Sequence, residues 1–272
     1  MTVPAIAAIQ MTSAHEVSAN LAEARRLVGE AAEQGAALVV LPENFAFMAR
    51  SDAERRELVE VAGRGPIQDA LASMAREFGV WLVGGTLPLE RADDPRPANA
   101  CLVFDAGGHQ VARYDKIHLF DVDLPGRDES YRESAHAAPG REPVVVDTPC
   151  GRLGLSVCYD LRFPELYRRL VAAGAELLSV PAAFTVPTGR AHWEVLLRAR
   201  AIESQCWVVA AAQWGRHSNG RETWGDSLQV DHWGRVVARL QAGAGVVVAE
   251  PDLEAQALDR KRFPVLQHRV LG

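Results

Sequence analysis

The sequence has little of what several classes of protein require. Its 272 residues include only four cysteines and no CxxC pair, and no apolar run is long enough to span a membrane. Its 29 lysines and arginines are outnumbered by 35 aspartates and glutamates, which gives a formal net charge of −6. We therefore expect no disulfide framework, no metal site, no nucleic-acid partner and no membrane partner.

The beginning of the sequence also lacks a basic segment ahead of its first apolar residues, so we expect no secretory leader and a cytoplasmic location. Hydrophobic residues make up 48% of the chain, enough to bury a large core. No linker, low-complexity tract or run of charge interrupts it. We predict that residues 1–272 form a single domain.

Lysine is rare. The chain contains only Lys116 and Lys261, so 27 of its 29 basic residues are arginines. A lysine in such a chain suggests a task that an arginine cannot perform. The lysine ammonium is a compact point charge, whereas the arginine guanidinium is a planar group that presents paired N–H donors.

Apolar runs and amphipathic segments alternate along the chain, which predicts alternating strands and helices. Apolar strands covered by amphipathic helices indicate a layered α/β sandwich with a mixed sheet. Residues 121–142 are expected to form a long loop, and a polar tail should follow residue 249. Strands are expected at residues 3–9, 36–41, 80–87, 99–104, 110–114, 144–146, 153–157, 176–180, 207–212, 228–230, 236–240 and 246–249. Helices are expected from residue 20 to Gly35 and at residues 52–62, 67–78, 164–173 and 192–205.

Cys158 follows a predicted strand, and Pro164 suits the first turn of the next helix. The thiol is therefore expected at the carboxyl end of a strand, where open α/β sheets bind ligands. Cys101 and Cys206 lie within apolar patterns typical of buried core cysteines. Cys158 precedes the polar pair Tyr159 and Asp160 and is the candidate nucleophile.

A thiol nucleophile requires a base. Glu43 follows the strand at residues 36–41 and is a candidate at a second strand end, although a lone glutamate there is more often a solvated loop residue. His192 and His118 are the candidates for a Cys–His hydrolase. Lys116 lies at a third strand end and could direct its charge at an oxyanion, unless it is an ordinary solvated lysine.

Three segments together resemble the signature blocks of the nitrilase superfamily of carbon–nitrogen hydrolases. They are Leu41-Pro42-Glu43, the segment Tyr114-Asp115-Lys116-Ile117-His118-Leu119, and residues 154–166 around Cys158. Their order along the chain also matches, and three blocks are far more specific than one motif.

This resemblance implies a four-layer αββα sandwich, assembled as a homodimer or higher homo-oligomer. It implies that Glu43 is the general base, that Lys116 stabilises the oxyanion and that Cys158 is the nucleophile. The segment Tyr131-Arg132-Glu133-Ser134 matches a further block, so Glu133 is carried over as the residue that orients Lys116 and the attacking water. As a bare sequence feature, Glu133 could equally be an ordinary loop acid.

Within the superfamily, residues 191–203, 208–217 and 262–269 resemble the branch of deaminated glutathione amidases, which act in metabolite repair. ω-Amidases acting on 2-oxoglutaramate share the Lys116 and Cys158 blocks and remain an alternative, as does another small-amide or nitrile hydrolase. Asp226 stands where these relatives commonly have histidine, and His232 where they commonly have proline. Both departures bear on packing around the site and on substrate range.

The expected reaction is acyl transfer to Cys158 through a thioester, with the Tyr159 backbone N–H as a second oxyanion donor and no cofactor. Arg162 is the candidate partner for the carboxylate of a small-molecule amide substrate, or else it ties down its own loop. Phe184 and Thr188 are weaker candidates for lining the pocket. A non-catalytic protein on this fold would be expected to lack Glu43, Lys116 or Cys158.

Overall fold

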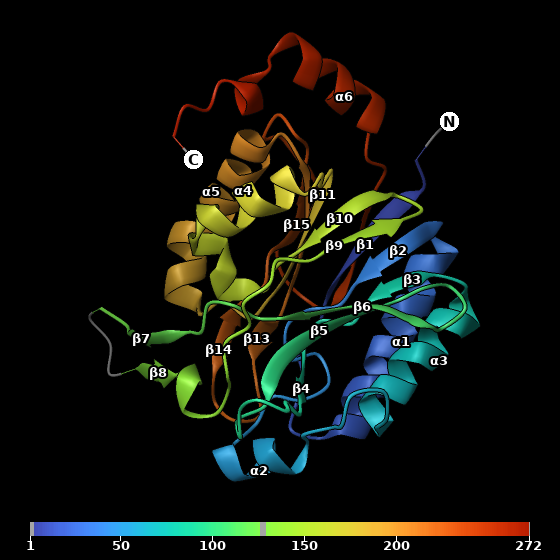
Figure 1. Ribbon diagram of the computed structural model, residues 1–272. Helices are drawn as coiled ribbons and strands as arrows, with labels where there is room; N and C mark the ends of the chain where they lie inside the picture. Colours follow the sequence, from blue (N-terminus) through green and yellow to red (C-terminus); the bar gives the residue numbers. More distant parts are fainter. Residues whose placement is uncertain (1–2, 126–128, 272) are drawn as a thin grey trace.

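Two β-sheets packed face to face form the centre of the computed structural model, which describes residues 3–125 and 129–271 (Figure 1). In spatial order, the first sheet contains β17 (Gly245–Ala249), β1 (Ala5–Gln10), β2 (Ala36–Val40), β3 (Trp81–Val83), β5 (Ala98–Phe104) and β4 (Leu87–Leu89), with β6 (Gln110–Asp115) beside β5. The second contains β16 (Val236–Leu240), β15 (Ser227–Val230), β12 (Trp207–Ala212), β11 (Leu177–Ala182), β10 (Gly151–Leu155) and β9 (Val145–Thr148). Parallel strands occupy the middle of each sheet and antiparallel strands its edges.

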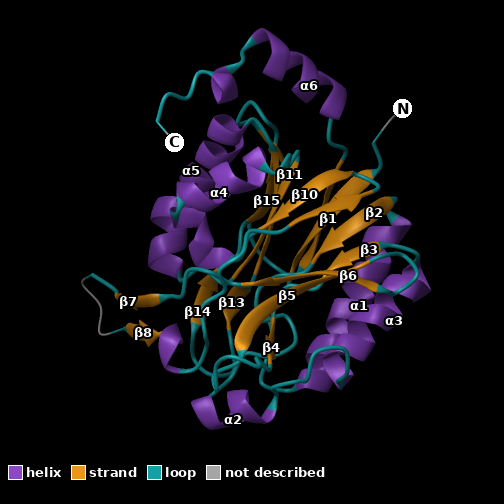
Figure 2. Ribbon diagram, in the orientation of Figure 1, coloured by secondary structure: helices purple, strands orange, loops and turns teal. Residues whose placement is uncertain are grey.

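Helices cover the outer face of each sheet (Figure 2). α1 (Val17–Glu33) and α3 (Pro66–Phe78) lie against the first sheet, and α4 (Pro164–Ala172) and α5 (Val186–Ser204) against the second. These four layers confirm the expected αββα sandwich. The two sheets are separate, whereas the strand pattern alone suggested one mixed sheet.

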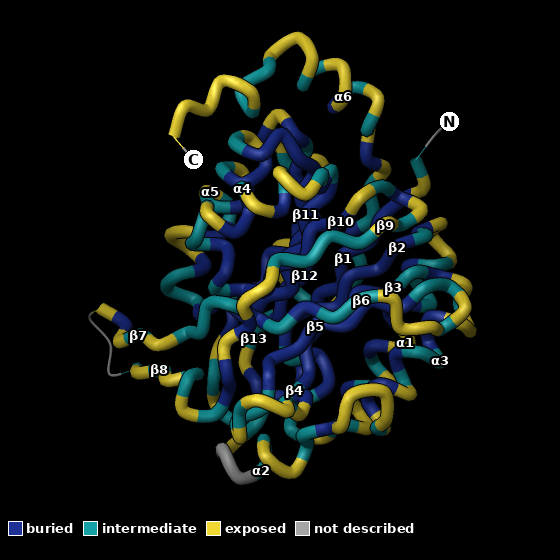
Figure 3. Tube along the Cα trace, viewed as in Figure 1, coloured by how far each residue is buried: buried dark blue, intermediate teal, exposed yellow. Residues whose placement is uncertain are grey.

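Side chains of β1 alternate between two apolar cores, as the two-residue period of a strand requires. Ile6 and Ala8 point into the space between the sheets, while Ala7 and Ile9 pack beneath the helices. The central strands are consequently buried along their length (Figure 3). This double burial explains why these strands read as continuous apolar runs.

Gln213, which directly follows β12, joins the two sheets at the edge where several strands end. Its side-chain Nε2 donates to the backbone oxygen of Glu43 at 3.1 Å and to Ser13 Oγ at 2.7 Å, and its Oε1 accepts from Ser13 N at 3.0 Å. A fully buried amide with these partners holds the end of β2 in register with the second sheet.

Three expected elements are wrong in extent. The helix expected at 192–205 is α5 and begins at Val186, before the expected start. The helix expected at 52–62 is α2 (Asp52–Glu57) and ends early, because Glu60 pairs with the β4 backbone and its carboxylate accepts from Ile67 N at the start of α3. The strand expected at 80–87 is broken into β3 and β4 at Gly84 and Gly85.

Other elements were not expected. The loop at 121–142 contains a hairpin of β7 (Asp121–Asp123) and β8 (Ser130–Arg132) followed by the 3₁₀ turn η1 (Glu133–Ala135), and residues 126–128 lie outside the described residues. A second hairpin pairs β13 (Trp214–Arg216) with β14 (Glu222–Trp224). The polar tail forms α6 (Leu253–Arg262) and the short turn η3 (Val265–Gln267).

None of the helices in the described ranges combines the length and apolarity needed to cross a bilayer.

Gly85 makes the turn between β3 and β4 possible. Its φ is +52°, and a Cβ atom there would overlap the carbonyl oxygen of Pro42, the residue before Glu43. Gly79 also has a positive φ, +63°, but a Cβ there would have no neighbour within 4 Å. An alanine at position 79 would therefore meet backbone strain alone, whereas an alanine at position 85 would meet both strain and a steric clash.

We expect Gly79→Ala to lower the free energy of unfolding by about 1 kcal/mol, the cost of a left-handed alanine. Gly85→Ala should lower it by roughly 1–3 kcal/mol more, because the new methyl group must displace Pro42. Urea denaturation of both variants measures the difference. Equal losses would show that the close approach at Pro42 is relieved without cost.

Candidate active site

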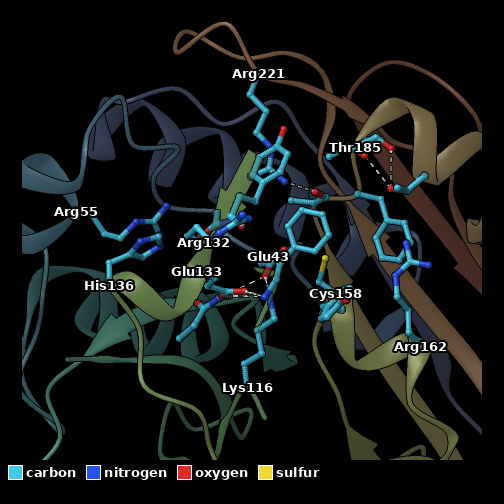
Figure 4. A pocket seen from close by; sticks show the side chains of 18 residues that line it. Glu43, Arg55, Lys116, Arg132, Glu133, His136, Cys158, Arg162, Thr185 and Arg221 are labelled. Carbon is cyan, nitrogen blue, oxygen red and sulfur yellow. Dashed lines mark hydrogen bonds and ion pairs between the residues drawn. The ribbon is translucent and has the colours of Figure 1, made fainter. Parts of the chain in front are cut away.

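Four of the residues singled out in the sequence, Glu43, Lys116, Glu133 and Cys158, meet in one pocket at the strand ends (Figure 4). Glu43 follows β2, Lys116 follows β6, Glu133 opens η1, and Cys158 opens the 3₁₀ turn η2 (Cys158–Arg162) after β10. The first sheet and its loops contribute the charged groups, and the second contributes the thiol. The pocket encloses about 620 Å³, part of it open to solvent, a size typical of small-molecule sites.

The Lys116 side chain is held between two carboxylates. Its Nζ donates to Glu43 Oε1 at 2.7 Å and to Glu133 Oε2 at 2.8 Å, and only 1% of the residue is exposed. Burial by itself lowers the pKa of Lys116, but the charges of Glu133 and Glu43 outweigh it and raise that pKa above its usual range. Lys116 is therefore a permanently charged group inside the protein and not a solvated strand-end lysine.

Asn99, at the start of β5, completes this cluster and was missed in the sequence. Its Nδ2 donates to Glu133 Oε1 at 3.1 Å and to Glu43 Oε1 at 3.4 Å. Phe120 N donates to Glu133 Oε2 at 2.7 Å. Burial acts to raise the pKa of Glu133, yet the Lys116 charge and these donors lower it overall. The signal that could have found Asn99 is a polar residue within an otherwise apolar strand.

Cys158 lies beside the carboxylate of Glu43 and is 7% exposed. Both residues line the pocket, so the thiol and the carboxylate share one cavity. Burial raises the pKa of Cys158, and the Glu43 charge adds to this effect while Lys116 opposes it. The resting thiol is consequently neutral and shares its pocket with a carboxylate.

The backbone of Cys158 is in the left-handed region, with φ of 48°, which is unusual for a residue other than glycine. Asp160 holds the turn. Its fully buried carboxylate accepts from Val157 N at 2.9 Å, from Tyr114 Oη at 2.6 Å and from the His118 backbone and ring. Because Tyr114 and His118 flank Lys116 in sequence, Asp160 joins the thiol-bearing turn to the lysine-bearing segment.

The two histidines named as alternative bases have other partners. His118 Nδ1 bonds to Asp160 at 2.7 Å and its ring stacks on Phe163, while His192 Nδ1 accepts from Arg162 Nη1 at 3.2 Å. Neither is among the described residues that line the pocket.

Arg162, Phe184, Thr188 and Tyr159 all line the pocket. The Arg162 guanidinium lies over the Phe184 ring at 5.2 Å and over the Tyr159 ring at 5.6 Å. Thr188 Oγ1 and Thr185 Oγ1 are 2.8 Å apart. Tyr131, Arg132 and Arg221 also line the pocket, and Tyr131 and Arg221 were not recognised in the sequence.

Asp226 and His232, the two residues that depart from the pattern of the related amidases, lie outside the pocket lining. Asp226 binds Arg239 through both carboxylate oxygens, at 2.6 and 2.8 Å, and its backbone oxygen accepts from Trp193 Nε1. Trp193 packs on Phe184, so Asp226 supports the pocket wall from behind. His232 bonds to Asp259 of α6 at 2.8 Å and anchors the terminal helix.

Comparisons with known proteins agree on one family. The family model described as carbon–nitrogen hydrolase matches residues 5–261. A deaminated glutathione amidase of Yersinia enterocolitica is 44% identical over 97% of this chain and 92% of its own length, and a human protein of the same name is 46% identical over 98% and 82%. The crystal structure of the Caenorhabditis elegans NitFhit protein superposes with a TM-score of 0.91 at 42% identity, and this chain covers 66% of that longer one.

Removing the Lys116 charge should destabilise the protein strongly, because two buried carboxylates lose their common partner. We expect Lys116→Met to lower the free energy of unfolding at pH 7.5 by about 3–5 kcal/mol. Lys261→Met, at the exposed second lysine, should change it by less than about 0.5 kcal/mol.

The loss in Lys116→Met should shrink at pH 5. In the native protein the depressed pKa of Glu133 stabilises the fold above about pH 4.3, and this contribution fades as the pH falls through the folded-state pKa. Without the ammonium, the paired carboxyls acquire raised pKa values, and protonation at pH 5 relieves their repulsion. A loss independent of pH would mean that packing, not charge, is the origin.

Proposed function

The chain belongs to the carbon–nitrogen hydrolase family, and from this premise we propose that it hydrolyses deaminated glutathione to 2-oxoglutarate and cysteinylglycine. As a member of this family it is an amidase acting on a small-molecule amide. The deaminated glutathione amidases, at 43–46% identity over nearly the whole chain, support the choice of substrate. The observation that carries the mechanism is the meeting of the Cys158 thiol, the Glu43 carboxylate and the Lys116 ammonium in one pocket.

In the proposed mechanism, Glu43 accepts the thiol proton as Cys158 Sγ attacks the amide carbonyl carbon. The presence of the neutral thiol and the Glu43 carboxylate in one pocket supports this role, since a thiol with a raised pKa requires a nearby base. The Lys116 ammonium donates to Glu43 and to both carboxylate oxygens of Glu133, and the donor of the longest contact, 3.2 Å to Glu133 Oε1, is proposed to turn to the oxyanion. The Tyr159 N–H is proposed as the second donor.

Glu43 then gives its proton to the leaving amine, the C–N bond breaks, and a thioester to Cys158 remains. Water, losing a proton to Glu43, attacks the thioester carbonyl, and the released thiolate recovers that proton. Glu133 keeps Lys116 oriented through both steps and helps to orient the water. Each residue ends the cycle in its starting protonation state, so the chemistry requires no cofactor.

Arg162 is proposed to bind the carboxylate of the α-keto acid end of the substrate. Its only described polar side-chain contact is with the imidazole of His192, so its charge has no carboxylate partner among the described residues. Stacking between Phe184 and Tyr159 orients the guanidinium without consuming its hydrogen-bond donors on the open side.

We further propose that residues 1–272 act as a single hydrolase domain in the cytoplasm, as a homodimer or higher homo-oligomer. Val195 and Ile202, seven residues apart on one face of α5, are 67% and 51% exposed. An exposed apolar stripe of this kind favours self-association.

Cys158→Ala should abolish hydrolysis of deaminated glutathione, lowering kcat by more than about a thousandfold. Cys101→Ala is the matched control, because Cys101 is fully buried in β5 and its pKa is raised to about 12 by burial. Iodoacetamide should likewise inactivate the enzyme by modifying Cys158, which lines the pocket.

The same assay, extended to 2-oxoglutaramate, a nitrile and an N-carbamoyl amino acid, tests the substrate. The highest kcat/KM is expected for deaminated glutathione. Faster turnover of 2-oxoglutaramate would make the chain an ω-amidase, and activity remaining in Cys158→Ala would refute the thioester mechanism.

Arg162→Met should lower kcat/KM for deaminated glutathione about tenfold to a hundredfold more than for a neutral small amide. A charge-assisted hydrogen bond is lost only with the first substrate, whereas damage to Cys158 would affect both. Arg168→Met, a half-buried arginine on α4 outside the pocket lining, serves as the control. Equal losses on the two substrates would assign Arg162 to holding its own loop.

A further inference from the structure

A second arginine on the pocket wall has no role in the mechanism. Arg221 precedes β14, lines the pocket and lies across it from Arg162, with Cys158 between them (Figure 4). Its Nη2 donates to the Ala183 backbone oxygen at 2.6 Å, and its guanidinium lies over the Tyr131 ring at 5.3 Å. These two contacts fix the orientation of the guanidinium.

The Nε atom of Arg221 is buried and has no hydrogen-bond partner in the described structure. A buried donor of a charged group without a partner is costly, and native proteins leave few of them. Its position on a pocket wall offers a reason, since a ligand can supply the acceptor. Nε with a neighbouring Nη forms the fork that binds a carboxylate.

The charge of the pocket points to the same kind of ligand. Its described lining residues include five cationic side chains, those of Arg55, Lys116, Arg132, Arg162 and Arg221, and two carboxylates, those of Glu43 and Glu133. Both carboxylates bind Lys116, and Arg132 binds Asp123 outside the pocket. The positive charges of Arg162 and Arg221 are therefore available to a ligand that lies in the pocket on either side of the Cys158 thiol.

We propose that Arg221 binds a carboxylate on the leaving-amine part of the substrate, so that the site selects amides with an anionic group at each end. This inference rests on the proposed function, in which the acyl end is held by Arg162. An amide whose nitrogen leaves as ammonia has no group to place at Arg221, whereas a peptide amine ending in a free carboxylate has one. Arg221 is then the residue that distinguishes a peptide-like amide from a primary amide.

The test compares deaminated glutathione with its C-terminal carboxamide, which has the same acyl group and the same scissile bond. The native enzyme should prefer the free carboxylate by about tenfold to a hundredfold in kcat/KM, the value of one charged hydrogen-bonded pair. Arg221→Met should abolish this preference by lowering only the rate on the carboxylate substrate. Arg190→Met is the matched control, because Arg190 also lies over an aromatic ring, that of Trp224, but is exposed and outside the pocket lining.

Arg162→Met provides the opposite pattern. It should lower kcat/KM on both compounds, since both share the acyl end, while the preference for the free carboxylate persists. If Arg221→Met is inactive on both compounds, Arg221→Gln is used instead, because glutamine can still donate to the Ala183 oxygen. The ratio of kcat/KM for the free carboxylate to kcat/KM for the carboxamide then tests the role of Arg221.

The outcomes separate this inference from the proposed function. A native enzyme that hydrolyses neither compound refutes the proposed function. A native enzyme that hydrolyses both equally well, or an Arg221 variant that keeps the native preference, refutes the role of Arg221 and leaves the amidase assignment standing.

Discussion

The charge of Lys116 imposes the strictest constraint on this structure. An ammonium with 1% exposure is tolerable only if carboxylates replace the water it has lost. Glu43 and Glu133 do so, and they come from the end of β2 and from the turn after β8, which are far apart in the sequence. The first sheet and the segment around η1 must therefore be correctly assembled before the charge is stable. The same contacts orient the ammonium toward the pocket.

The second sheet brings the thiol to this charged cluster, and buried polar side chains hold the two halves together. Asp160 connects the turn of Cys158 with the residues beside Lys116, and Gln213 connects the end of β12 with the backbone of Glu43. Each of these groups is fully buried and fully engaged. Their hydrogen bonds set the spacing between thiol and carboxylate that proton transfer requires.

Charge is distributed unevenly between the molecule and its pocket. The chain as a whole carries −6, yet cationic side chains predominate along the pocket wall. A pocket of this kind attracts anionic substrates and holds them by directed hydrogen bonds rather than by general attraction to the surface. In the proposed reaction, Arg162 and Arg221 bind the two ends of such a substrate, and the scissile bond lies between them at Cys158.

The sequence by itself determined the layered sandwich, and it singled out Glu43, Lys116 and Cys158 as candidates, because a polar residue placed directly after a buried strand is a local signal. The scarcity of lysine drew attention to Lys116, and a family resemblance added Glu133. Only the tertiary structure revealed Asn99 and Arg221. Their partners lie on distant segments, and such contacts produce no periodic pattern in the sequence. It also revealed α6, which the pattern missed because this helix docks through the polar side chains of Gln256 and Arg260 rather than through an apolar stripe. Local periodicity encodes which residues are buried, whereas hydrogen-bond partners across the molecule depend on how the two sheets pack.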